Sequence, residues 1–171
     1  MDIQDAVKGR RSIRRFRKTP VPEHLLKTLE ESLREAPSAG NLQSRRFYFV
    51  FRDETRKKLA DAAYGQEFIA EAPLAVVCCA DLKLASPYGE RGRSLYCLQD
   101  VAASVQNLLL VAYSLGLGTV WVGAFNEKEA SKILTLPDHL RPVAIIPVGY
   151  PAESPSRPAK VPREESIVYL R

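Results

Sequence analysis

The densest group of side chains able to do chemistry lies near the N-terminus, between Lys8 and Lys18. Seven of the 25 Lys and Arg residues fall in this stretch, and it contains no Asp or Glu. Without it the chain carries 18 bases and 20 acids, so the formal charge of +5 is a local property. A guanidinium donates two parallel hydrogen bonds, which suits the oxygens of a phosphate, and Ser12 adds a hydroxyl donor. The stretch predicts an anion-binding site; the alternatives are a solvated charge run and an arm that binds nucleic acid.

Composition narrows the class of protein. A length of 171 residues predicts one domain spanning 1–171, and 46% hydrophobic with 26% charged residues is typical of a globular protein. No apolar run approaches the roughly 20 residues of a membrane span, so we expect no membrane partner. We also expect no metal and a cytoplasmic location. The reason is that no metal-site spacing exists among the cysteines and histidines, which are Cys78, Cys79, Cys97, His24 and His139.

Apolar periodicity predicts strands that alternate with helices. Strands are expected at 47–51, 74–80, 118–125 and 143–148, and helices at 2–7, 22–36, 53–63, 93–115 and 126–134, with a helical turn at 66–71. Residues 81–93 are expected to form a polar excursion. Pro147 cannot donate to a strand ladder, so its strand should lie at an edge or stop pairing early. Residues 150–171 contain four prolines and should form an extended C-terminal arm. The pattern indicates an α+β or α/β protein with a mostly antiparallel or mixed sheet.

The pattern of predicted strands and helices makes two further predictions. The adjacent Cys78 and Cys79 should point to opposite faces of one buried strand. The apolar residues between Leu98 and Leu115 repeat nearly as a heptad. This helix is apolar enough either to be central in the fold or to face another subunit.

Four local patterns, in order along nearly the whole chain, resemble the nitroreductase-like family of flavoproteins. The first is Arg10–Phe16 (RRSIRRF), and the second is Ala36–Gln43 (APSAGNLQ). The third, Leu115–Phe125 (LGLGTVWVGAF), follows the long helix, and the fourth is Pro147–Pro151 (PVGYP). The resemblance implies an α+β fold in which helices flank a central sheet, and a domain-entwined homodimer with FMN in its interface.

The resemblance also assigns roles to the basic residues. Arg10 and Ser12 would hold the phosphate and ribityl chain of FMN, with Arg11 beside them. Arg14 would lie nearer the pyrimidine edge of the ring, where a cation favours flavin reduction. For Arg15 and Arg17 we prefer the plain interpretation, a solvated surface. In the C-terminal arm, Arg157 and Lys160 would add a second basic contact to the phosphate.

Two small-residue segments would contact the ring. The turn at Gly123 and Ala124 resembles the one whose backbone N–H groups face flavin N5 and O4, and Gln66 is a weaker candidate for the ring edge. The loop residues resemble those that pack on the flavin from the partner subunit, although an ordinary helix-to-strand loop would have the same composition. They are Pro37, Ser38, Ala39, Asn41 and Gln43.

The resemblance implies an FMN-dependent oxidoreductase. NAD(P)H would reduce the flavin, and a nitroaromatic, quinone or related small molecule would take the hydride in a ping-pong cycle. No side chain is required as a catalytic acid or base. The alternatives are a flavin carrier or sensor, or a specialised flavin-dependent reductase. We expect no nucleic-acid partner, because one short cationic segment lacks the extended basic face that such binding prefers.

The chain departs from the family pattern at two places. Gln43-Ser44-Arg45 stands where the family often has Gln-Pro-Trp, and the 81–93 excursion is short. Both changes bear on the acceptor rather than the cofactor. A shorter lid and an added Arg45 suggest an open pocket or an anionic ligand. The sequence does not choose between NADH and NADPH.

Overall fold

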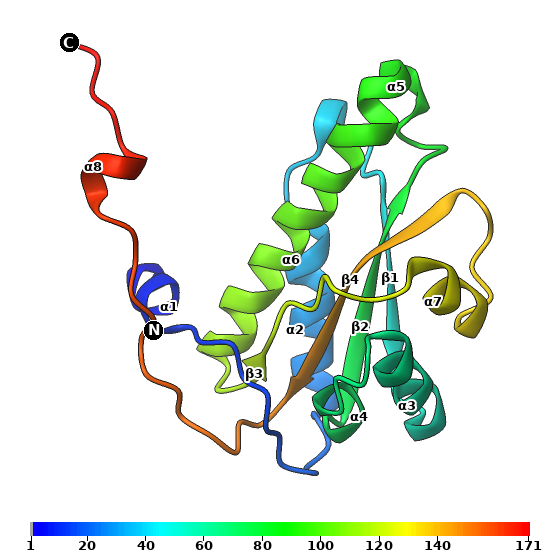
Figure 1. Ribbon diagram of the computed structural model, residues 1–171, viewed down its shortest axis with the longest axis vertical. Helices are drawn as coiled ribbons and strands as arrows, with labels where there is room; N and C mark the ends of the chain where they lie inside the picture. The colour runs from blue at the N-terminus through cyan, green and yellow to red at the C-terminus, as the bar shows by residue number, and fades with distance from the viewer. Residues whose placement is uncertain (1) are drawn as a thin grey trace.

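The computed structural model describes residues 2–171 and shows a sheet with helices on both faces (Figure 1). The strands are β1 (Arg45–Val50), β2 (Leu74–Asp81), β3 (Gly118–Thr119) and β4 (Leu140–Gly149). The helical segments are α1 (Ile3–Gly9), α2 (Glu23–Arg34), η1 (Ala39–Asn41), α3 (Asp53–Ala62), α4 (Phe68–Glu71), η2 (Ser86–Tyr88), α5 (Gly89–Arg91), η3 (Gly92–Tyr96), α6 (Cys97–Ser114), α7 (Glu127–Ile133) and α8 (Arg163–Ser166).

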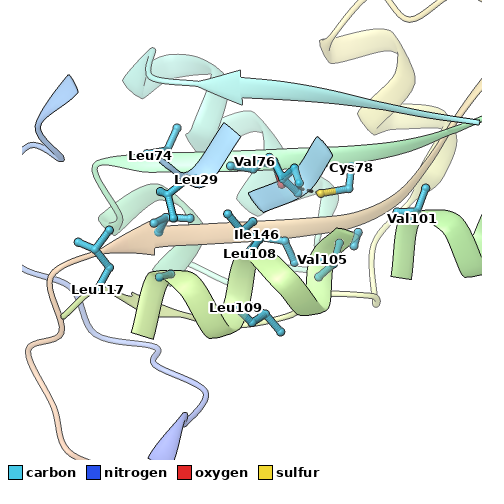
Figure 2. Packing of buried hydrophobic residues seen from close by; sticks show 14 of the residues in the cluster. Leu29, Leu74, Val76, Cys78, Val101, Val105, Leu108, Leu109, Leu117 and Ile146 are labelled. Carbon is cyan, nitrogen blue, oxygen red and sulfur yellow. Dashed lines mark hydrogen bonds between the residues drawn. The ribbon is translucent and has the colours of Figure 1, made fainter. Parts of the chain in front are cut away.

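The sheet has the order β1-β2-β4-β3, and every pair in it is antiparallel. β2 is buried along its whole length, and its residues alternate between two apolar clusters. Cys78 faces α2 and α6, whereas Cys79 faces α3, α4 and α7, so the predicted opposition of the two thiols is confirmed. Figure 2 shows the first cluster, in which Val105 and Leu108 of α6 lie against Val76 and Ile146 of the sheet. An α+β fold with an antiparallel sheet is therefore confirmed.

α6 is the central helix of this fold. Val101, Val105 and Leu108 are fully buried, so the apolar stripe packs inside the protomer against the sheet and α2. The stripe thus gives no separate evidence for a subunit interface. By length and composition alone, the helical run Ser86–Ser114 could cross a membrane, but its apolar side chains serve the core. The predicted 81–93 excursion is itself largely helical from Ser86 onward and runs directly into α6.

The strand predicted at 118–125 and the edge position predicted for Pro147 need correction. Only Gly118–Thr119 forms a strand, followed by an isolated bridge between Val122 and Ile145. β4 is an interior strand, and Pro147 pairs with Ala75 of β2. Ile145 and Val122 donate a backbone hydrogen bond to each other. Because backbone N–H groups alternate in direction along a strand, the nitrogen of Pro147, two residues later, also faces the chain that contains β3 and Val122. Because proline has no N–H to donate there, the ladder is interrupted on that side. β4 nevertheless keeps pairing beyond Pro147, with Val148 opposite Thr119 and Gly149 opposite Gly118, so neither predicted alternative is correct.

The arginine-rich stretch runs between β3 and the beginning of the C-terminal arm. Ser12 forms a parallel bridge with Thr119. On the other side, the N–H of Arg17 donates to the carbonyl of Tyr150 at 2.9 Å. The arm then leaves the sheet, passes α1 and ends away from the body (Figure 1). The first and last segments of the chain are therefore brought side by side.

Candidate functional site

Two buried apolar side chains fix the direction of the arginine-rich stretch. Ile13 and Phe16 are only 7% and 8% exposed, while Arg14 and Arg15 between them reach solvent. Gly118 allows this close packing, because a Cβ there would come within 2.8 Å of the Ile13 side chain. The stretch therefore has one face anchored on the protein and its basic side chains directed away from it.

The basic residues of the N-terminus and of the arm line one cavity of about 540 Å³. More than 140 residues of chain separate its two sides. The cavity is lined by predicted site residues from both segments, namely Arg10, Arg11, Ser12, Arg14, Arg157 and Lys160. So many cations around one opening give the cavity the chemistry needed to bind a dianionic group such as a phosphate.

The arginines of this cavity have different surroundings. Nη1 of Arg11 donates to the carbonyls of Lys8, Gly9 and Arg10 at 2.8–3.0 Å, so part of this guanidinium closes the C-terminal end of α1. Arg14 lies over the ring of Phe68, 6.0 Å from its centroid. Arg15 and Arg17 are exposed, as predicted.

A carboxylate that the sequence analysis did not single out holds the arm to this stretch. Glu153 accepts a hydrogen bond from the backbone N–H of Arg14 at 2.5 Å. The two positions are 139 residues apart in the sequence, so no local signal could have predicted this contact. Its effect is to keep the arm, and with it Arg157 and Lys160, beside the arginine-rich stretch.

The turn at Gly123 and Ala124 lies next to Gln66, just before α4. Both residues are exposed, and among residues 2–171 a Cβ on Gly123 would meet only Trp121 Nε1, at 3.9 Å. Nε2 of Gln66 donates to the carbonyl of Ala124 at 3.0 Å and so holds the turn in place. Gln66 also lies two residues before Phe68, on which Arg14 stacks. A chain of neighbouring residues, Arg14, Phe68 and Gln66, thus connects the cavity to the turn.

The predicted loop Pro37–Gln43 lies elsewhere. Its Ala39 is bonded to Asp100 near the start of α6, whereas Gly9 of α1 packs on Tyr113 near the end of the same helix. Thirteen residues of helix separate these contacts, which corresponds to roughly 20 Å. Figure 1 shows the loop beyond one end of α6 and the arginine-rich stretch at the other. Within one protomer the structure does not bring the two groups together.

Arg45 does not have the role suggested by the sequence. It is only 9% exposed, and it donates to the carbonyls of Arg34, Ala36 and Pro37 at 2.6–3.0 Å. Burial lowers the pKa of this guanidinium, and Asp100 opposes that shift. Its donors are thus used inside the protein, so the interpretation of Arg45 as a contact for an anionic ligand is wrong.

Comparison with known proteins places this arrangement in a family. The model of the nitroreductase family matches residues 7–83 and 62–150. The NADH dehydrogenase of Thermus thermophilus is 35% identical, over 99% of this chain and 96% of that protein. The FMN reductase (NAD(P)H) of Bacillus subtilis is 29% identical, over 95% of this chain and 71% of that protein. The structure of nitroreductase A from Vibrio parahaemolyticus has a TM-score of 0.92 and 26% identity, covering 100% of this chain and 77% of that one. The chain therefore belongs to the nitroreductase family, whose members are NAD(P)H nitroreductases and FMN reductases.

Proposed function

We propose that this protein is an FMN-dependent oxidoreductase that uses NAD(P)H to reduce a nitroaromatic, a quinone or a related small molecule. The observation that carries the proposal is the cavity in which Arg10, Ser12 and Arg14 meet Arg157 and Lys160. The donor set fits FMN, since guanidinium, ammonium and hydroxyl groups all donate to phosphate oxygens. The family membership and the similar FMN reductase support the same cofactor.

FMN, when bound, would supply the chemistry, which is hydride transfer from NAD(P)H to the acceptor. The chain contributes binding, orientation and electrostatics. Arg10 and Ser12 would hold the phosphate end, and Arg14 would add a cation toward the ring. The turn at Gly123 and Ala124 offers backbone donors and leaves the reactive edge open, because no bulky side chain stands on it.

We further propose that the working form is a homodimer. The residues Pro37, Ser38, Ala39, Asn41 and Gln43 belong to the predicted flavin site but lie at the far end of α6. They can contact the same flavin as Arg10 only if they come from a second copy. The arm supports this, because the exposed apolar side chains Ile167, Val168, Tyr169 and Leu170 at its end have no apolar cluster of their own protomer around them among the described residues 2–171. We also infer a cytoplasmic location, which the free thiols of all three cysteines support.

The experiment that tests the proposal begins with the identity of the flavin. Purified protein should be yellow, and denaturation should release FMN rather than FAD, as read by chromatography. Anaerobic addition of NADH or NADPH should bleach the absorbance near 450 nm, and an added quinone or nitroaromatic should restore it. Protein that stays colourless after incubation with FMN would contradict the proposal.

Reduction by NAD(P)H separates the proposed enzyme from a flavin carrier or sensor. If the donor and the acceptor use the same face of the flavin in turn, steady-state kinetics should be ping-pong, with parallel lines in double-reciprocal plots. A stably bound flavin that neither nucleotide reduces would support the carrier or sensor instead. Strong, salt-dependent binding to DNA or RNA would point to a nucleic-acid function for the arginine-rich stretch.

A further inference from the structure

The loop between α2 and β1 has an unusual backbone. Gly40, Asn41 and Gln43 all have positive φ, at 54°, 56° and 52°. Gly40 adopts this conformation freely, but for Asn41 and Gln43 it is uncommon and costs free energy. Strained residues persist only where the surrounding structure holds them, and they cluster at functional sites. The side chains of Asn41 and Gln43 are exposed, so the strain is not explained by packing of these residues in the core.

The carboxylate of Asp100 holds both ends of this loop. Oδ1 accepts the backbone N–H of Ala39 at 2.9 Å, and Oδ2 accepts the hydroxyl of Ser44 at 2.6 Å. Asp100 and Ser44 are only 4% and 2% exposed. Inside the loop, the hydroxyl of Ser38 accepts the N–H of Gln43 at 3.0 Å. A single buried acid on α6 therefore fixes where the loop begins and where it ends.

Arg45 also stabilises the beginning of this loop. Its guanidinium donates to carbonyls at the end of α2 and just after it, including that of Pro37, which is the first residue of the loop. Another of its bonds, longer at 3.4 Å, reaches the carbonyl of Asp100. Ser44 and Arg45 are the two residues at which the chain departs from the Pro-Trp that its family often has. In this chain Ser44 supplies a hydroxyl donor where the proline would have no N–H to donate. Arg45 supplies a guanidinium where the tryptophan would have an indole.

We propose that Asp100, Ser44 and Arg45 are positioning residues that preset the loop Pro37–Gln43 to receive the flavin held by a second copy of the chain. This inference rests on the proposed function, because it takes the loop to be part of a composite FMN site. Presetting matters because a loop that is already ordered loses little conformational freedom when the ligand binds. The strained backbone then presents the amide groups of Asn41 and Gln43 to the ligand without a rearrangement.

Two serine substitutions test the proposal against plain stabilisation of the fold. Ser44→Ala removes the hydroxyl bonded to Asp100. Ser104→Ala is the matched control, because Ser104 is also buried and lies on α6, one turn after Asp100. Its hydroxyl donates at 2.8 Å to the carbonyl of Leu33 in α2 and not to the loop. Both variants leave the side chains of the arginine-lined cavity intact. Three quantities are measured for each variant: the melting temperature, the Kd for FMN, and hydrogen exchange of the loop amides without FMN.

We expect both variants to melt at similarly reduced temperatures. Only Ser44→Ala should exchange the amides of Ala39 and Gln43 about tenfold faster, and only Ser44→Ala should bind FMN about tenfold more weakly, since the loop must then be ordered on binding. Equal Kd values for the two variants, or faster exchange in Ser44→Ala with unchanged FMN affinity, would overturn the proposal. If wild-type protein binds no FMN, the proposed function fails, whereas the exchange comparison still shows whether the loop is preset.

Discussion

At the scale of single residues, the basic side chains near the N-terminus are not equivalent. The buried Ile13 and Phe16 set the direction of the stretch, and the cavity takes in Arg10, Ser12 and Arg14 but not Arg17. A site of this kind binds through particular hydrogen bonds, whereas a diffuse cationic surface would bind through total charge.

Substitution distinguishes these two possibilities. Arg10→Ala and Ser12→Ala should weaken FMN binding more than Arg17→Ala does. A hydrogen bond to a charged group contributes about 1.5–3 kcal/mol, so the loss for Arg10 should be about 10- to 100-fold in Kd. Titration of apoprotein with FMN, followed by the quenching of flavin fluorescence, measures each value. Similar losses for Arg10→Ala and Arg17→Ala would show that charge alone holds the ligand.

The cysteines give a second prediction at this scale. All three are fully buried, and burial raises the pKa of Cys79 to about 12 and that of Cys78 well above its usual range. Burial also raises the pKa of the Cys97 thiol. Since the thiolate is the reactive form, folded protein at pH 8 should react negligibly with a thiol reagent such as Ellman's, and three thiols should titrate in denaturant. One rapidly modified thiol in the folded protein would contradict the burial described above.

At the scale of elements, the interruption opposite Pro147 shapes the site. β3 ends at Thr119, and after the single bridge between Val122 and Ile145 the chain turns away from β4. Gly123 and Ala124 are therefore at the surface, and Ala124 accepts a hydrogen bond from Gln66. If the strand had continued to Phe125, as the sequence predicted, Gly123 and Ala124 would have been paired with β4 instead of forming an exposed turn.

Gly123→Val tests the placement of this turn. The protein itself has room for a side chain there, since a Cβ on Gly123 would find only Trp121 Nε1 within 4 Å. The variant should therefore fold and retain FMN, while the added bulk should slow reduction by NAD(P)H about tenfold or more, because a displacement near the reacting atoms is costly. Stopped-flow absorbance measures this rate, and Ala124→Ser provides a nearby control that adds little bulk. An unchanged reduction rate in Gly123→Val would place the reactive edge elsewhere.

The elements were largely predictable from the sequence, because they follow apolar periodicity. β2 and β4 contain the runs expected at 74–80 and 143–148, and the capping side chain of Asn126 accepts the N–H groups of Lys128 and Glu129 as its helix begins. What could not be predicted depends on contacts distant in sequence. From sequence, Arg45 resembles an exposed cation, but in the fold it is buried between α2 and α6. Glu153 can accept the N–H of Arg14 only because the fold places the arm beside Arg14.

At the scale of the whole molecule, the separation of the two groups of site residues gives a testable assembly. FMN-loaded protein should sediment as a dimer at micromolar concentration, because in the proposed assembly each flavin needs the cavity of one copy and the loop of another. Removing residues 163–171, which include the exposed apolar end of the arm but neither Arg157 nor Lys160, should weaken the dimer. Full-length protein that sediments as a monomer with one tightly bound FMN would contradict the assembly.

The position of the two groups at opposite ends of α6 also has a genetic consequence. Each subunit of such a dimer lends its arginines to one centre and its loop to the other. Arg10→Ala and Asn41→Ala homodimers should therefore both be impaired, but a mixed dimer collects both defects in one centre and leaves the other wild type. Co-expression of the two variants with different affinity tags should restore up to half the flavin content to the purified heterodimer. Two inactive alleles of this protein should thus complement each other, although neither supplies a functional chain.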